Sequence, residues 1–141
     1  MVIKTSRFGD VECQDEYVFS FEEGLLGFPE DRKFVILNHP GSGVFKWLQS
    51  LDDPELAFVI TEPFLFFPDY EFDIDDAFVT GLKIKDPQKV LVYTILVIPP
   101  DTKRITANLK APIIINGDNR KGKQVILLDD KYSTKQYIFI E

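Results

Sequence analysis

Four carboxylates stand at every second position in the middle of this chain, a spacing that could support three kinds of chemistry. They are Asp69, Glu71, Asp73 and Asp75. Because successive side chains of an extended strand point to opposite faces, a strand here would present all four on one face. Neighbours on that face would lie about 6.6 Å apart, a separation compatible with two glycosidase carboxylates. The pattern is therefore compatible with sugar hydrolysis, a metal site or attraction of a cationic partner.

The residues around these carboxylates do not favour catalysis or calcium binding. A calcium loop beginning at Asp69 would need glycine at its sixth position and glutamate at its twelfth, where this chain has Ile74 and Thr80. No flanking polar cluster suits a sugar, and any Asp-x-Asp stretch on a strand reproduces the spacing. A small hydrolase, or a barrel that binds a ligand or metal through these carboxylates, stays as the alternative function.

The residues between the carboxylates favour a rigid recognition surface. Tyr70, Phe72 and Ile74 would anchor the opposite face of the strand to the core. The acidic side chains would then be held on a stiff element, which suits a cationic protein partner. The competing interpretation is a solvated edge strand whose charge prevents aggregation. The neighbouring aromatic residues favour the binding role.

Charge is distributed unevenly along the chain. Residues 1–75 hold 5 basic and 16 acidic side chains, a net −11, while residues 76–141 hold 11 basic and 7 acidic, a net +4. Such a distribution steers basic partners toward the acidic half and opposes nucleic acid there. We therefore expect protein partners and no direct binding of nucleic acid.

The numbers of cysteines and histidines and the lengths of the apolar runs limit the remaining classes of function. Cys13 is the only cysteine, which excludes an internal disulfide and a thiolate zinc cluster. A nucleophilic Cys13 would need a base such as the sole histidine, His39, and a buried thiol with a loop histidine is the simpler interpretation. We expect no enzyme activity, no cofactor and no metal. No run is long enough for a signal peptide or a membrane span, so we expect a cytoplasmic protein without membrane contact.

Strands must position these residues, because aromatic and β-branched side chains are abundant. Ten short strands are predicted, at Val2–Arg7, Tyr17–Phe21, Lys33–Leu37, Phe45–Gln49, Leu56–Thr61, Lys89–Ile98, Ile105–Leu109, Pro112–Asn116, Lys123–Leu128 and Gln136–Ile140. The run Lys89–Ile98 is almost continuously apolar, which indicates a central barrel strand or one buried on both faces.

Two local signals complete the predicted fold. Asn116 and Gly117 both tolerate positive φ and predict a hairpin. One short helix is predicted over Asp76–Leu82, with Asp75 or Asp76 as its N-cap and Phe78 facing the core. The sequence thus predicts an all-β, mostly antiparallel, small β-barrel-like single domain over residues 1–141, with one short helix.

Four segments in this order resemble a known family over nearly the whole chain. They read GLLGFPEDRKFVIL at 24–37, FKWLQSLDDPELAFVI at 45–60, PDYEFDID at 68–75 and TANLKAPIIIN at 106–116. Together they resemble the FliW family of flagellar assembly factors. The resemblance implies a small β-barrel-like cytoplasmic protein that exchanges partners and performs no catalysis.

The resemblance also implies two partners. One is flagellin, held in a chaperone-like complex before export, and the other is CsrA, which represses translation of flagellin mRNA until FliW binds it. We assign the electrostatic attraction of CsrA to Asp69, Glu71, Asp73 and Asp75. For flagellin we expect an apolar groove that accepts an amphipathic helix, with candidate anchors Trp47, Leu48, Phe64 and Phe66.

Overall fold

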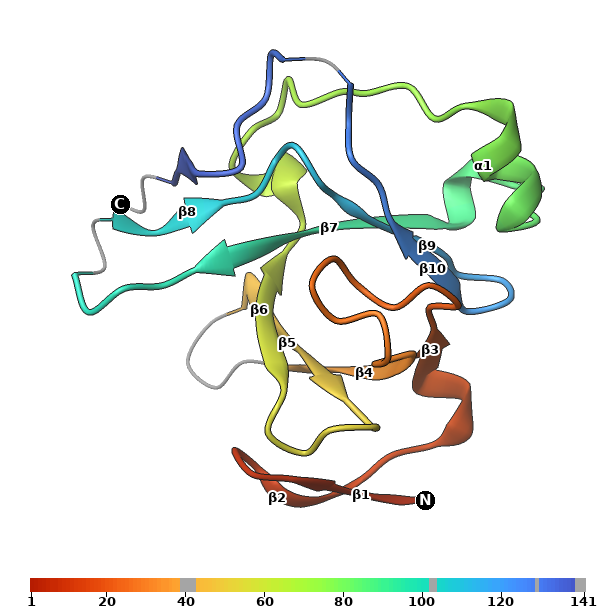
Figure 1. The fold of residues 1–141 in the computed structure, drawn as a ribbon, viewed down its shortest axis with the longest axis vertical. Coiled ribbons are helices and arrows are strands. Elements are labelled where there is room, and N and C mark those ends of the chain that lie inside the picture. The colour runs from red at the N-terminus through yellow and green to blue at the C-terminus, as the bar shows by residue number, and fades with distance from the viewer. Residues whose placement is uncertain (39–42, 102–103, 129, 139–141) are drawn as a thin grey trace.

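Strands of the main sheet close on themselves into a barrel (Figure 1). The computed structural model describes residues 1–38, 43–101, 104–128 and 130–138. Within them, the barrel order is β3 (Val18–Ser20), β4 (Lys33–Asn38), β5 (Phe45–Ser50), β6 (Ala57–Thr61), β7 (Val90–Val97), β9 (Ile113–Asn116) and β10 (Lys121–Gln124). A single parallel bridge, Lys121 to Ser20, closes β10 onto β3, and the other barrel pairings are antiparallel. The predicted all-β, barrel-like class is confirmed.

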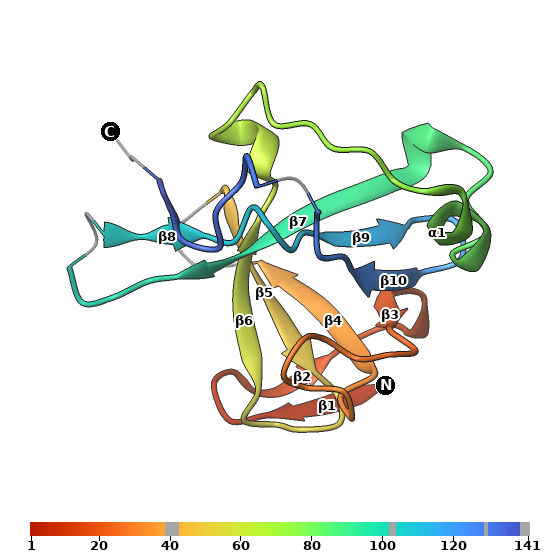
Figure 2. The same cartoon turned by 45° about the horizontal axis from the view of Figure 1, so that its top comes forward.

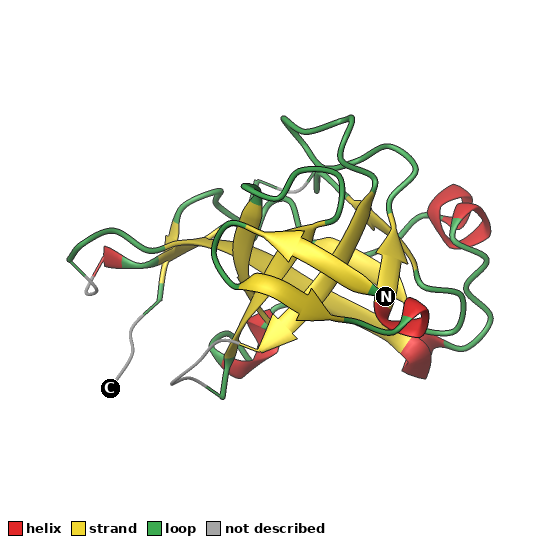
Figure 3. Cartoon of the chain, turned by 90° about the horizontal axis from the view of Figure 1, so that it is seen from below, coloured by secondary structure: helices red, strands yellow, loops and turns green. Residues whose placement is uncertain are grey.

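Smaller elements surround this barrel (Figures 1 and 3). A separate hairpin joins β1 (Val2–Thr5) to β2 (Gly9–Glu12), and β8 (Thr106–Ala107) with β11 (Gln136–Tyr137) extends the sheet beyond β7. The helical elements are η1 (Asp15–Tyr17), η2 (Pro63–Leu65), α1 (Asp76–Gly81) and η3 (Pro87–Lys89). In the described part of the chain, no helix has both the length and the apolar character needed to cross a membrane.

The apolar run in β7 lies between two neighbouring strands. Its first half pairs with β9 and its second half pairs with β6, while Leu96 and Val97 also pair with β8. β7 therefore lies between β6 and β9 in the barrel, and it buries Tyr93, Thr94 and Leu96, but Val97 at its end is 62% exposed, so the strand is not buried on both faces throughout. The prediction of a central barrel strand is therefore confirmed.

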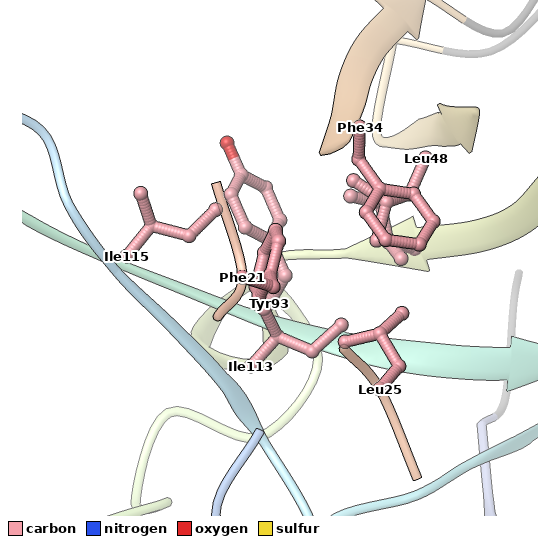
Figure 4. Packing of buried hydrophobic residues seen from close by; sticks show 8 residues of the cluster. Phe21, Leu25, Phe34, Leu48, Tyr93, Ile113 and Ile115 are labelled. Carbon is pink, nitrogen blue, oxygen red and sulfur yellow. The ribbon is translucent and has the colours of Figure 1, made fainter. Parts of the chain in front are cut away.

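The barrel is filled by one apolar cluster, shown in Figure 4. Phe21 and Phe34 meet edge to face inside it, with ring centroids 5.5 Å apart, and neither side chain is exposed. The other buried members are Leu25, Leu48, Ile60, Tyr93, Ile113 and Ile115.

A second cluster lies beneath residues 69–75, which we call the acidic segment. Its buried members are Phe45, Tyr70, Leu96, Ile105, Ala107, Leu109, Leu127 and Ile138. Phe72 and Tyr132 pack against it while half-buried. The carboxylates are thus positioned by this cluster, which is distinct from the cluster inside the barrel.

The predicted strand at 69–75 is wrong. Residues 71–75 are extended but form no ladder with any described strand, and Tyr70 N closes a turn by donating to Phe67 O. The expected alternation nevertheless holds, since Glu71 and Asp73 are exposed while Phe72 and Ile74 are half-buried. An extended backbone alternates its side chains whether or not a neighbouring strand is present.

Several predicted strand boundaries also differ. No strand is predicted at β2, because its short sequence GDVE carries no alternating apolar pattern, and its pairing with β1 comes from the hairpin turn. The strand predicted at 123–128 begins at Lys121 and ends at Gln124, and the one at 105–109 shrinks to β8. The last predicted strand is described only as β11, and residues 139 and 140 lie outside the described residues.

The hairpin at Asn116 is confirmed, but the predicted reason for it is wrong. Asn116 pairs with Lys121, so the turn spans residues 117–120 and the positive φ falls on Arg120, at 60°. Gly117 is required for space, because a Cβ there would lie 2.7 Å from the carbonyl oxygen of Lys89.

This hairpin holds the end of α1 in place. Asn116 Nδ2 donates to the carbonyls of Leu82 (2.9 Å) and Lys83 (3.2 Å), and Asn119 Nδ2 also donates to Leu82 O (3.0 Å). These bonds satisfy carbonyls that the helix leaves without intrahelical partners. The short helix is therefore fixed beside β10, as Figure 2 shows.

Candidate partner-binding site

Tyr70 anchors the acidic segment to the second cluster. Only 4% of its surface is exposed, and its hydroxyl donates to Leu109 O at 2.6 Å. Its ring meets Tyr132 edge to face at 4.7 Å. Burial, with a smaller contribution from Tyr132, raises the pKa of Tyr70 above its ordinary value, so the hydroxyl remains a donor at neutral pH.

Tyr132 makes the hydrogen bonds to Glu71 that a neighbouring strand would otherwise make. Its hydroxyl accepts a hydrogen bond from Glu71 N at 3.0 Å and donates one to Glu71 O at 2.8 Å. Both backbone groups of Glu71 are thus satisfied by one side chain, which leaves the Glu71 carboxylate turned to solvent. Sequence reasoning missed Tyr132, because it lies 61 positions from Glu71 and belongs to no motif.

Asp75 has a structural role in addition to its charge. Its side chain accepts from Phe78 N at 2.7 Å and caps α1, which confirms one of the two predicted caps. Phe78 is half-buried and Leu82 is buried, as expected for the inner face of this helix. One oxygen of Asp75 is therefore committed to the helix.

A groove of about 1050 Å³ opens beside the acidic segment, and we call it the β10 groove. One wall is formed by residues 71–75, 77 and 78 and the other by residues 121–128, and Glu22, Glu23, Gly24 and Leu26 line the groove beside the second wall. Figure 2 shows the chain leading into α1 on the same side of the barrel as β10 and the segment after it. Three large apolar side chains of the groove are exposed: Leu26 (50%), Ile126 (56%) and Leu128 (97%).

The structure brings three of the four predicted carboxylates to this groove. Glu71, Asp73 and Asp75 line it, whereas Asp69 lies in the preceding turn, exposed and outside the lining. The β10 groove itself was not predicted, because its walls are about 50 residues apart in sequence.

The ion pairs around the groove leave the charges of Glu71 and Asp73, on what we call the acidic wall (residues 71–78), uncompensated. Lys121 Nζ lies 3.8 Å from Glu22 and Lys123 Nζ lies 3.3 Å from Glu23. These exposed pairs contribute little stability, but they place a carboxylate beside Lys121 and Lys123, two of the three lysines that line the groove, the third being Lys131. Across residues 1–38, 43–101, 104–128 and 130–138, neither Glu71 nor Asp73 has an ion-pair partner. No group of three potential metal ligands is found in those ranges either.

The four apolar candidates do not share one surface. Trp47 is half-buried on β5, where its ring meets Phe8 at 5.6 Å and lies 4.5 Å from the Arg7 guanidinium carbon. Leu48, the next residue, points into the barrel and is completely buried.

The other two apolar candidates lie near the second cluster. Phe64, in η2, is 45% exposed, and its ring lies 5.8 Å from that of Tyr70. Phe66 is half-buried against Phe45, with 6.1 Å between the ring centroids.

Cys13 is buried, and burial raises the pKa of its thiol, which disfavours the nucleophilic thiolate. Its Sγ donates to Gln14 O at 3.4 Å. His39, the proposed base, lies outside the described residues.

Comparison with known proteins places this chain in a family. The family model described as FliW protein matches residues 2–138. A flagellar assembly factor FliW from Ruminiclostridium cellulolyticum is 43% identical over 142 residues, covering 100% of this chain and 96% of that protein. Another, from Caldicellulosiruptor bescii, is 47% identical over 138 residues, covering 98% and 90%.

A solved structure agrees with these sequence matches. It is described as the crystal structure of the flagellar assembly factor FliW, and it matches with a TM-score of 0.91 at 42% identity, covering 100% of this chain and 99% of that one. Because the family model, the full-length relatives and the fold coincide, this chain belongs to the FliW family of flagellar assembly factors.

Proposed function

We propose that this protein, acting as one domain in the bacterial cytoplasm, binds flagellin in one complex and CsrA in another, and so antagonises the repression of flagellin mRNA by CsrA. The observation that supports it most is the uncompensated pair Glu71 and Asp73, held outward by Tyr70 and Tyr132 in a member of the FliW family. If the complexes exclude each other, mass action between the free partners sets which one forms. No reaction on either partner is needed.

Glu71 and Asp73 are proposed as the main electrostatic contacts of CsrA. A protein that grips RNA carries a basic surface, and complementary charge speeds encounter and fixes orientation. Asp69 would extend the field from the turn. Asp75 would contribute less, because its carboxylate already accepts the cap bond of α1.

The exposed ring of Phe64 is proposed as the main apolar contact of flagellin, with Phe66 beside it. Trp47 is a second candidate, on β5. Leu48 has no exposed surface and would support the site from within the barrel. An amphipathic helix of flagellin would then bury apolar side chains against these rings.

Size-exclusion chromatography with CsrA, followed by addition of flagellin, tests the partners and their exclusivity together. We expect a complex with CsrA that dissociates when flagellin is added. A ternary complex that persists with flagellin in excess would contradict the exchange.

Calorimetry at several salt concentrations tests the assigned carboxylates. The double change Glu71→Lys and Asp73→Lys should weaken CsrA binding by about tenfold or more and flatten its salt dependence. The matched control is Asp10→Lys with Glu12→Lys, which alters charge equally on the exposed β2. Equal losses in both double variants would refute the assignment.

A flagellin pull-down tests the apolar contact. Phe64→Ala should leave the protein folded, because 45% of the ring is already exposed, and should weaken capture of flagellin. A sharp loss of thermal stability with capture intact in the folded fraction would show that Phe64 belongs to the core.

A further inference from the structure

Beyond Lys121, the groove-facing edge of β10 and of the residues after it pairs with no described strand. β10 pairs with β9 along its whole length but with β3 only at Lys121. Beyond β10, Val125 N donates to Pro112 O (3.0 Å) and Leu127 N donates to Lys110 O (2.8 Å). The ladder toward β9 therefore continues through residue 127.

Antiparallel geometry decides where the alternate residues point. In such a ladder, residues that bond to the partner strand alternate with residues whose N–H and C=O point the other way. Since Val125 and Leu127 bond on the β9 side, Gln124 and Ile126 direct their backbone groups to the opposite side. Among the described residues, no backbone bond is formed by Ile126.

The chain after β3 stays beside β10 as far as Gln124 and leaves the edge open beyond it. β3 ends at Ser20, and Gly24 takes φ 65° in the turn that follows. The Gln124 side chain holds the turn beside β10, because its Oε1 accepts from Leu26 N (2.9 Å) and its Nε2 donates to Ala111 O (3.1 Å).

An open edge with exposed apolar side chains is a site that proteins normally protect. Here Ile126 and Leu128 are 56% and 97% exposed beside the edge, and neither is covered by another described segment. The opposite wall, residues 71–74, is also extended and carries the uncompensated Glu71 and Asp73. The space between these walls therefore has the features that select an extended, basic and partly apolar chain.

We propose that the β10 groove binds an extended segment of a partner protein, which adds a strand along residues 124–128. The segment alternates apolar side chains, which contact Ile126 and Leu128, with Lys or Arg side chains, which face Glu71 and Asp73. Main-chain hydrogen bonds to Gln124 and Ile126 give such strand addition its affinity, and the side chains give its specificity. The inference rests on the proposed function only in sharing Glu71 and Asp73.

A short peptide of alternating Lys and Val, blocked at both ends, is the probe. Titrated into the ¹⁵N-labelled full chain, it should shift the amide signals of Gln124 and Ile126 and slow their hydrogen exchange. Methylation of the peptide amides that face the edge should weaken binding about tenfold, since two hydrogen bonds are lost. A peptide with Glu in place of Lys should not bind.

Two variants of Ile126 test where on the protein the peptide binds. Ile126→Pro removes only a groove-facing N–H and spares the bonds of Val125 and Leu127, and proline is tolerated at such edges. Ile126→Ala is its matched control, because it also removes most of the Ile126 side chain but keeps the N–H. We expect peptide binding to fall about threefold further in the proline variant than in the alanine variant, since one hydrogen bond is lost.

The results separate this inference from the proposed function. Two results would overturn the added strand, whether or not CsrA and flagellin bind. One is peptide binding that methylation leaves unchanged, and the other is no binding of the unmethylated peptide to the natural chain. Loss of peptide binding in a folded Ile126→Pro variant that still binds CsrA supports the added strand and shows that CsrA uses the carboxylates without it. If Ile126→Pro does not fold, the methylated peptide decides the question.

Discussion

The two walls of the β10 groove are both extended, yet they are held by different forces. Residues 121–127 are fixed by a backbone ladder to β9 and to the segment before it. Residues 70–75 have no ladder and are fixed by two tyrosine hydroxyls and one aspartate cap. A ladder spreads its stability over many bonds, whereas the acidic wall depends on a few side chains. Single substitutions should therefore loosen the acidic wall while the barrel stays folded.

The largest expected effect is on the barrel, which supports the ladder wall. Phe34→Ala should lower the free energy of unfolding by about 3–5 kcal/mol, because the ring is fully buried against Phe21. Urea denaturation measures this loss, with Phe64→Ala as the exposed control. Equal losses in the two variants would contradict the division between a rigid barrel and a peripheral site.

Tyr70→Phe should have the next largest effect and should act on the acidic wall. It removes the donor to Leu109 O and leaves that buried carbonyl without its bond, at a cost of about 1–3 kcal/mol. Tyr17→Phe, at a 57% exposed residue, is the control and should change little. Urea denaturation of both variants decides whether the hydroxyl or only the ring of Tyr70 anchors the segment.

Asp75→Ala should cost about 1 kcal/mol, the usual value of a lost N-cap. Asp73→Ala, two residues earlier in the same exposed segment and without a cap bond, should change stability by less than about 0.5 kcal/mol. Thermal unfolding of both variants gives the difference. A larger effect at Asp73 would mean that its carboxylate has a structural role.

Tyr132→Phe should have the smallest global effect, because its two bonds to Glu71 are near the surface. Its local effect should be clear: the Glu71 amide should exchange with solvent faster, while amides of β9 keep their protection. Hydrogen exchange followed by NMR measures both. Faster exchange throughout β9 would show that the two walls are coupled.

Much of the fold was predictable from local patterns. The apolar run of β7, the Asp75 cap and the alternation at 70–75 were each indicated by neighbouring residues in the sequence. Patterns of this kind depend on backbone geometry that repeats every two residues in strands, or on the first turn of a helix. The strand predicted at 69–75 was wrong, because alternation reports an extended backbone and carries no information about a neighbouring strand.

The sequence by itself determined the all-β class, the family and the presence of outward carboxylates backed by rings. Only the tertiary structure decided that Tyr132 holds Glu71, that Leu48 is buried inside the barrel, and that residues 71–78 and 121–128 enclose a groove. The physical reason is distance along the chain. Hydrogen bonds and packing between residues 50 or more positions apart leave no periodic pattern in the sequence, so they are fixed only when the barrel closes.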